Sequence, residues 1–267
     1  MRVMTGDAAA RGRIAAVFDI DGTLLPAPSL ELRLLARLAL KGELRLGAAG
    51  SWLRSFIAQI VSVPRDGEEF SRLKHFLDEN KLYLAGVRVA VAEKCIARQL
   101  EEFEFFSEAL AMMDWHRRCG HAIVLISGTL APLARTVGSL LVEDEAFLIR
   151  GTELERDSDE WTGRIAGEAI CGPAKEQALL ESAIEHNFDL RRSYAYANSM
   201  RDRWLLSAVG HPIAVNPSAI LARHARRLGW RITSWRERVR LQRPVLHSSY
   251  SRGQQTGQIF AEKSLWK

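Results

Sequence analysis

The stretch of sequence that decides the fold reads Ile14-Ala-Ala-Val-Phe-Asp-Ile-Asp-Gly-Thr23. Its first five residues form a short apolar run, which favours a buried strand, and Gly22 gives the chain a place to turn. Asp19 and Asp21 therefore come directly after the predicted strand. Polar side chains at the end of a buried strand indicate a candidate site.

Polar residues also follow two later apolar runs. Ala122–Ile126 and Tyr194–Ala197 have the length and composition of buried strands, and each is followed by polar side chains. Ligands of open α/β sheets bind outside the carboxyl ends of the strands, so residues far apart in sequence are expected to converge there. The candidate site residues are Asp19, Asp21, Ser127, Lys175, Asn198 and Asp202.

Strand and helix patterns alternate through most of the chain, which predicts βαβ units and a parallel sheet. We expect an α/β core from residues 1–26 and 107–235. A helical insert is predicted over residues 27–106, where apolar residues recur at helical spacing and Ser29 is a candidate N-cap. The remaining predicted elements are helices from Ser107 to Arg118, from Pro132 and from Pro173 to Ile184, strands at Phe147–Ile149 and Pro212–Val215, and a hairpin joining Thr152–Glu155 to Thr162–Ile165.

Composition and charge narrow the class of protein. The chain has 267 residues, of which 47% are apolar and 26% charged, values close to those of globular proteins. Residues 236–267 carry seven basic and two acidic side chains and lack periodicity, which predicts a basic, largely disordered tail. The rest of the chain is neutral overall, so no nucleic-acid partner is expected.

The location of the protein is expected to be cytoplasmic. Cys95, Cys119 and Cys171 are widely spaced, which argues against a disulfide framework or a zinc site and fits a reducing compartment. The first thirteen residues lack the apolar run of a signal peptide, and no stretch is long and apolar enough to span a membrane.

Four motifs occur in order along the chain: Val17-Phe-Asp-Ile-Asp-Gly-Thr-Leu-Leu25, Leu125-Ile-Ser-Gly-Thr129, Gly172-Pro-Ala-Lys175 and Tyr196-Ala-Asn-Ser-Met-Arg-Asp202. Together they resemble the motifs of the haloacid dehalogenase (HAD) superfamily. Val209–Pro217 and Gly229–Ile232 further resemble subfamily IB, the phosphoserine-phosphatase-like enzymes. This resemblance implies a Rossmann-like parallel sheet with a helical C1-type cap inserted after the first strand.

The resemblance also implies a reaction, the Mg²⁺-dependent hydrolysis of a small phosphomonoester. Asp19 is then the nucleophile that forms an aspartyl-phosphate, and Asp21 is the general acid and base. Ser127, Gly128 and Lys175 are expected to bind the substrate phosphate. The expected oxygen ligands of Mg²⁺ are Asp19, Asp21, Asn198 and Asp202.

Departures from the family pattern leave alternatives open. Asn198 stands where a metal-binding Asp is usual, so a catalytically weakened protein that binds phosphorylated ligands is one alternative. A phospholipid-headgroup phosphatase is another, because the basic tail could make weak contact with an anionic membrane. Asp21 argues against a dehalogenase, since dehalogenating members lack this second aspartate. Glu31 is displaced from the position of the Glu that holds the amine in phosphoserine phosphatases, which weakens a phosphoserine assignment.

Overall fold

A six-stranded parallel sheet forms the centre of the molecule. The computed structural model describes residues 12–62, 76, 78–99, 103–141 and 147–241. Within these ranges the strand order is β4-β3-β1-β7-β8-β9, and every neighbouring pair is parallel. The α/β fold with a parallel sheet is therefore confirmed. The strands of the sheet are β1 (Ala15–Phe18), β3 (Ala122–Leu130), β4 (Phe147–Thr152), β7 (Tyr194–Ala197), β8 (His211–Val215) and β9 (Arg231–Thr233).

Helices cover both faces of this sheet, and the alternation of side chains along β1 shows why. Ala15 and Val17 belong to one apolar cluster, with residues of α7, α8 and α9. Ala16 and Phe18 point the other way and belong to a second cluster, with residues of α5, α6 and the inserted helices. Because both faces of β1 are buried, the strand reads as a continuous apolar run. The helices of the core are α5 (Ser107–Arg118), α6 (Ala131–Leu141), α7 (Pro173–His186), α8 (Arg203–Ser207) and α9 (Ala219–Leu228).

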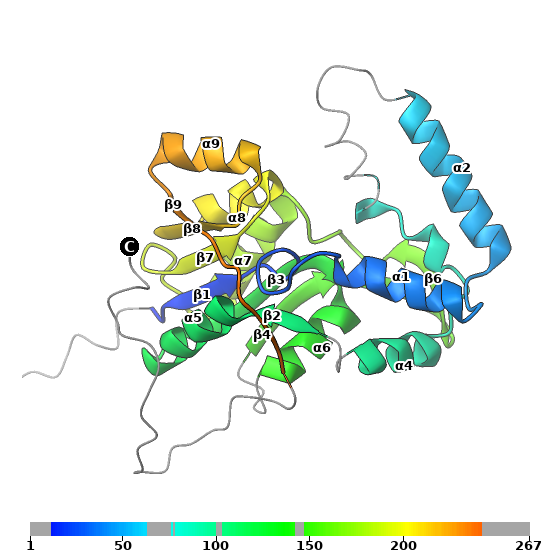
Figure 1. The fold of residues 1–267 in the computed structure, drawn as a ribbon, viewed down its shortest axis with the longest axis horizontal. Helices are drawn as coiled ribbons and strands as arrows, with labels where there is room; N and C mark the ends of the chain where they lie inside the picture. The colour runs from blue at the N-terminus through cyan, green and yellow to red at the C-terminus, as the bar shows by residue number, and fades with distance from the viewer. Residues whose placement is uncertain (1–11, 63–75, 77, 100–102, 142–146, 242–267) are drawn as a thin grey trace, which may run out of the picture.

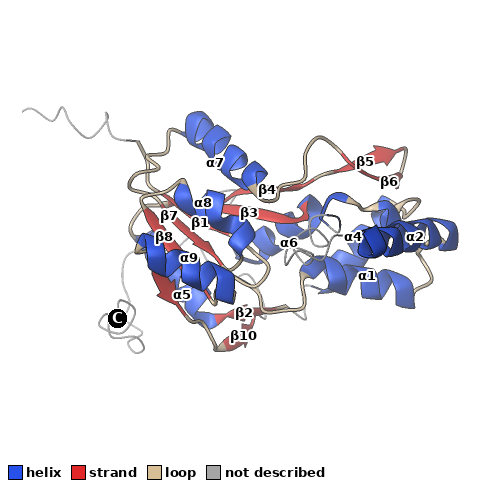
Figure 2. Ribbon diagram, turned by 90° about the horizontal axis from the view of Figure 1, so that it is seen from above, coloured by secondary structure: helices blue, strands red, loops and turns tan. Residues whose placement is uncertain are grey.

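A helical cap follows β1, as predicted. Figures 1 and 2 show α1, α2 and α4 gathered at one end of the molecule, beyond the sheet. Ser29 caps α1 by accepting a hydrogen bond from the Leu32 N–H. The predicted hairpin is also present, with β5 (Leu154–Asp157) antiparallel to β6 (Glu160–Ile165). The elements of the cap are α1 (Leu30–Leu40), α2 (Leu46–Ser62), the 3₁₀ turn η1 (Leu82–Leu84) and α4 (Val89–Gln99).

The prediction of a disordered tail from residue 236 is wrong for its first residues. β10 (Arg238–Arg240) pairs antiparallel with β2 (Glu104–Phe106), the segment that returns from the cap to the core. The Ser107 N–H also donates to the Glu237 carbonyl. These backbone hydrogen bonds order a stretch that has no apolar pattern of its own, and residues 242–267 of the predicted tail lie outside the described ranges.

The end of β3 also differs from the prediction. β3 continues past Ile126 to Leu130, with an irregular register against β4, so Ser127 lies in the strand rather than after it. The α5 helix has the predicted bounds, Ser107–Arg118, and its N-cap Phe106 makes no side-chain hydrogen bond. Among the helices of the described ranges, none is long and apolar enough to cross a membrane.

Candidate active site

A cavity of about 170 Å³ opens at the carboxyl ends of β1, β3 and β7. The lining includes every residue that the sequence analysis assigned to the site, from four separate segments of the chain. The convergence expected for a parallel sheet is therefore what the structure contains. The predicted residues that line the cavity are Asp19, Asp21, Ser127, Gly128, Lys175, Asn198 and Asp202.

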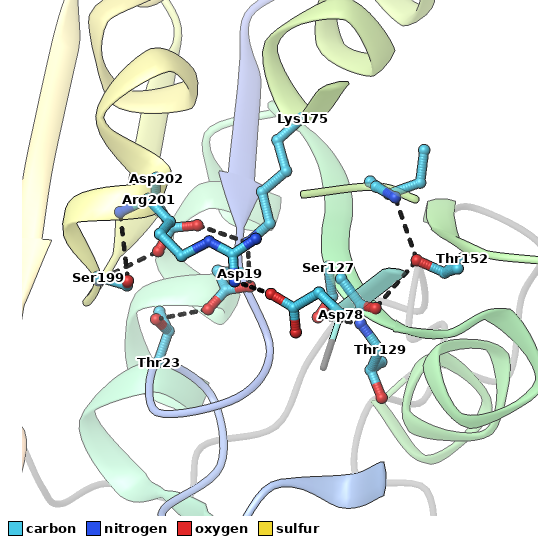
Figure 3. A network of polar contacts seen from close by, with 12 residues as sticks. Asp19, Thr23, Asp78, Ser127, Thr129, Thr152, Lys175, Ser199, Arg201 and Asp202 are labelled. Carbon is cyan, nitrogen blue, oxygen red and sulfur yellow. Dashed lines mark hydrogen bonds and ion pairs between the residues drawn. The ribbon is translucent and has the colours of Figure 1, made fainter. Parts of the chain in front are cut away.

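Lys175 forms ion pairs with two carboxylates in this cavity. Its ammonium Nζ lies 2.7 Å from Asp19 Oδ1 and 2.6 Å from Asp202 Oδ1 (Figure 3). Asp19 Oδ2 also accepts a hydrogen bond from the Thr23 hydroxyl. Asp202 Oδ2 accepts from the Ser199 N–H in a capping box that holds the turn after β7. All three charged groups are at least nine-tenths buried, so their positions are fixed relative to each other.

The pKa values of this group follow from burial and mutual charge. Burial raises the pKa of Asp19, an effect that the neighbouring Lys175 opposes. Burial alone would lower the pKa of Lys175, but Asp19 and Asp202 outweigh it and hold that pKa above its usual range. Lys175 therefore stays protonated. Its ammonium favours the carboxylate form of Asp19, the form required of a nucleophile.

The Asp21 carboxyl differs from that of Asp19 in its hydrogen-bond partner and in the causes of its raised pKa. It is the third residue after β1, and its Oδ1 accepts a hydrogen bond from the Leu30 N–H at the start of α1. Burial raises the pKa of Asp21 to about 7, and the charges of Asp19 and Glu31 act in the same direction. The Leu30 hydrogen bond lowers it in part. A carboxyl group with a pKa near 7 can both give and take a proton at neutral pH, as a general acid and base must.

Gly22 and Asn198 lie against each other at the turn after β1. Gly22 has φ +84°, a conformation that L residues rarely adopt, and a Cβ at this position would lie 2.0 Å from Asn198 Nδ2. A side chain at position 22 would therefore displace Asn198 from the cavity. The glycine lets the turn that carries Asp21 approach the segment that carries Asn198.

Ser127 and Gly128 form the opposite wall. Ser127 is buried, and its Oγ accepts a hydrogen bond from the Thr129 N–H. The Gly128 carbonyl accepts from the Thr152 hydroxyl, which anchors this end of β3. A hydroxyl and neighbouring backbone N–H groups beside a buried ammonium suit the oxygens of a phosphate group.

The donor set of the cavity fits a hard cation. Within the described residues, no group of three or more His, Cys, Asp or Glu side chains is arranged to hold a metal ion. The cavity does bring together the carboxylates of Asp19 and Asp202, the amide oxygen of Asn198 and the backbone of Asp21. Oxygen ligands of this kind are those that Mg²⁺ prefers, and part of its coordination is usually completed by water and substrate phosphate.

Charged residues of the cap also reach the cavity, and the sequence analysis did not assign them. Glu31 lines it, although its sequence position is displaced from the family pattern. Lys81 Nζ lies 2.6 Å from Glu31 Oε1, and the Tyr83 hydroxyl donates to the same oxygen. Asp78 lines the cavity as well and forms an ion pair with Arg201 of the core (Figure 3). Helical periodicity marks which cap residues are buried, but it does not say which ones face the core.

The arrangement as a whole brings two carboxyl groups of the turn after β1, a buried lysine and a buried serine hydroxyl into one cavity. The chain belongs to the haloacid dehalogenase-like hydrolase family, whose pattern it matches over residues 16–207. It is 30% identical over 238 residues to the "Inhibition of morphological differentiation protein" of Streptomyces azureus, covering 87% of this chain and 82% of that one.

Two further comparisons agree with this assignment. A probable phosphatase of Mycobacterium tuberculosis is 30% identical over 246 residues, which cover 88% of this chain and 80% of the relative. A phosphoserine phosphatase, solved as an analogue of the phospho-aspartyl intermediate, superimposes with a TM-score of 0.56 at 17% identity. That match covers 85% of this chain and 95% of the other, and it shows the shared fold.

Proposed function

We propose that the protein is a magnesium-dependent phosphomonoester hydrolase that acts through an aspartyl-phosphate on Asp19. The observation that carries the proposal is the contrast between two carboxyl groups that line one cavity, Asp19 and Asp21. Burial raises the pKa of both, but Asp19 is in contact with the Lys175 ammonium, which opposes the rise. Among the described residues no cation is in contact with Asp21, and its pKa is raised to about 7. Such a reaction requires a nucleophile that attacks phosphorus and a proton donor for the leaving oxygen.

In the first half-reaction, an oxygen of the Asp19 carboxylate attacks phosphorus and the bond to the leaving oxygen breaks. Asp21 gives its proton to that oxygen, so the product leaves as a neutral alcohol. In the second half-reaction, Asp21 takes a proton from water as the water oxygen attacks phosphorus, which releases phosphate and restores the Asp19 carboxylate. Ser127, the adjacent backbone N–H groups and Lys175 stabilise the phosphoryl oxygens in both steps.

The proposed ligands of Mg²⁺ are the carboxylates of Asp19 and Asp202, the amide oxygen of Asn198 and the Asp21 carbonyl. A bound divalent cation would neutralise charge on the phosphate and on the nucleophile. Asn198 gives this set one negative charge fewer than an aspartate would, so we expect weaker metal affinity. That same residue motivates the second candidate, a protein that binds phosphorylated ligands without turnover.

The proposed substrate is a small phosphorylated metabolite. Glu31 is already paired with Lys81, so it is not a free anion for a substrate amine. The nearby Glu31–Lys81 pair therefore does not favour phosphoserine. We also propose a cytoplasmic location, because Cys95, Cys119 and Cys171 are free thiols.

The test is phosphate release from an aryl phosphate with and without Mg²⁺, for the wild type and for Asp19→Asn. We expect metal-dependent release that Asp19→Asn abolishes. Asp157→Asn is the matched control, because it makes the same change at the exposed end of β5 and should keep full activity. Release that survives in Asp19→Asn would contradict the proposed nucleophile.

If the wild type releases no phosphate, Asn198→Asp tests whether the protein is a weakened phosphatase or only binds phosphorylated ligands. Activity gained by Asn198→Asp would show that the rest of the machinery is intact and that the natural chain is a weakened catalyst. In an active wild type, the same variant should reach half-maximal activity at a lower Mg²⁺ concentration.

A further inference from the structure

Arg201 brings a second cation into the cavity, beside Lys175. It lies in the 3₁₀ turn η3 (Met200–Asp202), and its side chain is only 17% exposed. Figure 3 shows it extending from this turn toward Asp78, in the same cluster as Asp19 and Lys175. The proposed mechanism uses Lys175 for the phosphate and leaves Arg201 without a role.

The partner of Arg201 is a residue of the cap. Asp78 precedes η1 and is 27% exposed, and both members of the pair line the cavity. The ion pair thus crosses from core to cap over the nucleophile. The Glu31–Lys81 pair is different, because Lys81 is 1% exposed and is not part of the cavity wall. A substrate bound in this cavity would therefore lie against both members of the Arg201–Asp78 pair.

We propose that Arg201 binds a second anionic group of the substrate, which takes the place of Asp78 on the guanidinium. This inference rests on the proposed phosphatase function. It narrows the substrate class to phosphomonoesters whose alcohol part carries a carboxylate or a second phosphate. Arg201 is then a specificity-determining residue, and Asp78 holds its side chain in place while the site is empty.

The chemistry of the two groups supports this exchange. The phosphate under attack lies at Asp19, Ser127 and Lys175, so the alcohol part of the ester must extend toward the cap. A planar guanidinium forms paired hydrogen bonds with either a carboxylate or a phosphate. A buried cation that loses its counter-ion is costly, so a substrate that displaces Asp78 needs an anion of its own.

The experiment compares four esters of three-carbon alcohols in the presence of Mg²⁺. They are propyl phosphate, 3-(phosphonooxy)propanoate, propane-1,3-diyl bisphosphate and 3-aminopropyl phosphate. Two of these esters, the propanoate and the bisphosphate, carry a second anionic group and are called the anionic esters. For one of them we expect the wild type to show a kcat/KM about tenfold or more above that for propyl phosphate, chiefly because KM is lower. The two anionic esters distinguish a carboxylate from a phosphate as the group recognised.

Three variants complete the test. Arg201→Met should bring the ratio of kcat/KM values for the anionic and propyl esters close to one. Asp78→Asn should raise it, because the competing carboxylate is gone. Arg203→Met is the matched control: this neighbouring arginine stacks on Trp204, 3.4 Å from the ring centroid, and its loss should leave the ratio unchanged. Because the ratio is measured within one preparation, partial misfolding of a variant cancels.

If Arg201→Met lowers kcat/KM by the same factor for all four esters, the inference is overturned. Arg201 would then act on the reacting phosphate or in cap closure. A wild-type preference for propyl phosphate or for the aminopropyl ester would overturn the inference as well, the latter in favour of Asp78 as the recognising group. Absence of release from every ester would instead count against the proposed phosphatase function, so the two failures are distinguishable.

Discussion

At the scale of single residues, Asp19 and Asp21 differ in what they touch. Asp19 lies against Lys175, while Asp21 has a backbone N–H as its hydrogen-bond donor. Burial acts on both carboxyls, but only Asp19 has a cation in contact to offset it. The same residue type two positions apart can therefore supply a nucleophile and a proton donor.

The raised pKa of Asp21 predicts a pH dependence. Because the free enzyme must carry the proton on Asp21 to protonate the leaving oxygen, kcat/KM for an alkyl phosphate should fall about tenfold per pH unit above about 7. Steady-state kinetics between pH 5.5 and 9 measure this fall. A nitrophenyl phosphate is the control, since its leaving oxygen needs little protonation and its decline should be shallower. Identical profiles for the two esters would argue against Asp21 as the acid.

Some residues of the site could be predicted from the sequence, and others could not. Asp19, Asp21, Ser127 and Lys175 lie near strand ends or at a helix start, where the topology of a parallel sheet brings residues together. Asp78 and Glu31 come from the cap, and their approach to the cavity depends on how the cap packs on the core. Arg201 was within a recognised motif, but only the ion pair with Asp78 draws attention to it.

At the scale of elements, the β5–β6 hairpin holds the cap in place. The Gly86 N–H donates to the Trp161 carbonyl at 2.7 Å, and the Trp161 N–H donates to the Val87 carbonyl at 2.9 Å. Trp161 is itself buried in the cluster that the cap and core share. The turn η1, which precedes this contact, carries Tyr83 and follows Lys81, so the hairpin also supports the Glu31 ion pair.

Gly163 of β6 is the position where this support can be tested. It has φ +79°, and a Cβ would lie 2.9 Å from Leu82 Cα. Gly163→Ala should lower the free energy of unfolding by more than the roughly 1–3 kcal/mol of backbone strain and should also raise KM. Gly167→Ala is the matched control, because φ is +85° and no atom lies within 4 Å of the added methyl. Urea unfolding and steady-state kinetics compare the two, and equal effects would contradict a role of the hairpin in placing the cap.

Three short strands are among the elements that the sequence did not predict. β1 and β7 were predicted because four or more apolar residues run together in each. β2, β9 and β10 have three residues each, and every residue of β10 is exposed, including its two arginines. Their extended conformation depends on pairing with a partner strand, and a local pattern cannot indicate that partner.

At the scale of the whole molecule, the shifted pKa values of two groups have opposite effects on how the free energy of unfolding changes with pH. Folded Asp21 keeps its proton up to about pH 7, whereas an unfolded aspartate loses it near 3.8. His116 in α5 is fully buried against Tyr196, and burial lowers its pKa from 6.5 to about 3. Between about pH 4.5 and 6, the folded chain thus holds one proton more at Asp21 and one fewer at His116 than the unfolded chain.

The two contributions to the free energy of unfolding should therefore nearly cancel in the wild type and appear when either group is removed. Asp21 makes stability fall with rising pH by about 1.4 kcal/mol per unit, and His116 makes it rise by about the same amount. Relative to the wild type, Asp21→Asn should gain stability as pH rises from 4.5 to 6, and His116→Phe should lose it. The hydrogen bond that Tyr196 loses in His116→Phe lowers stability equally at every pH, so the slope is unaffected. Urea unfolding across this range measures the slopes, and the double variant should run parallel to the wild type. Single variants that also run parallel to it would show that neither group titrates as its burial requires.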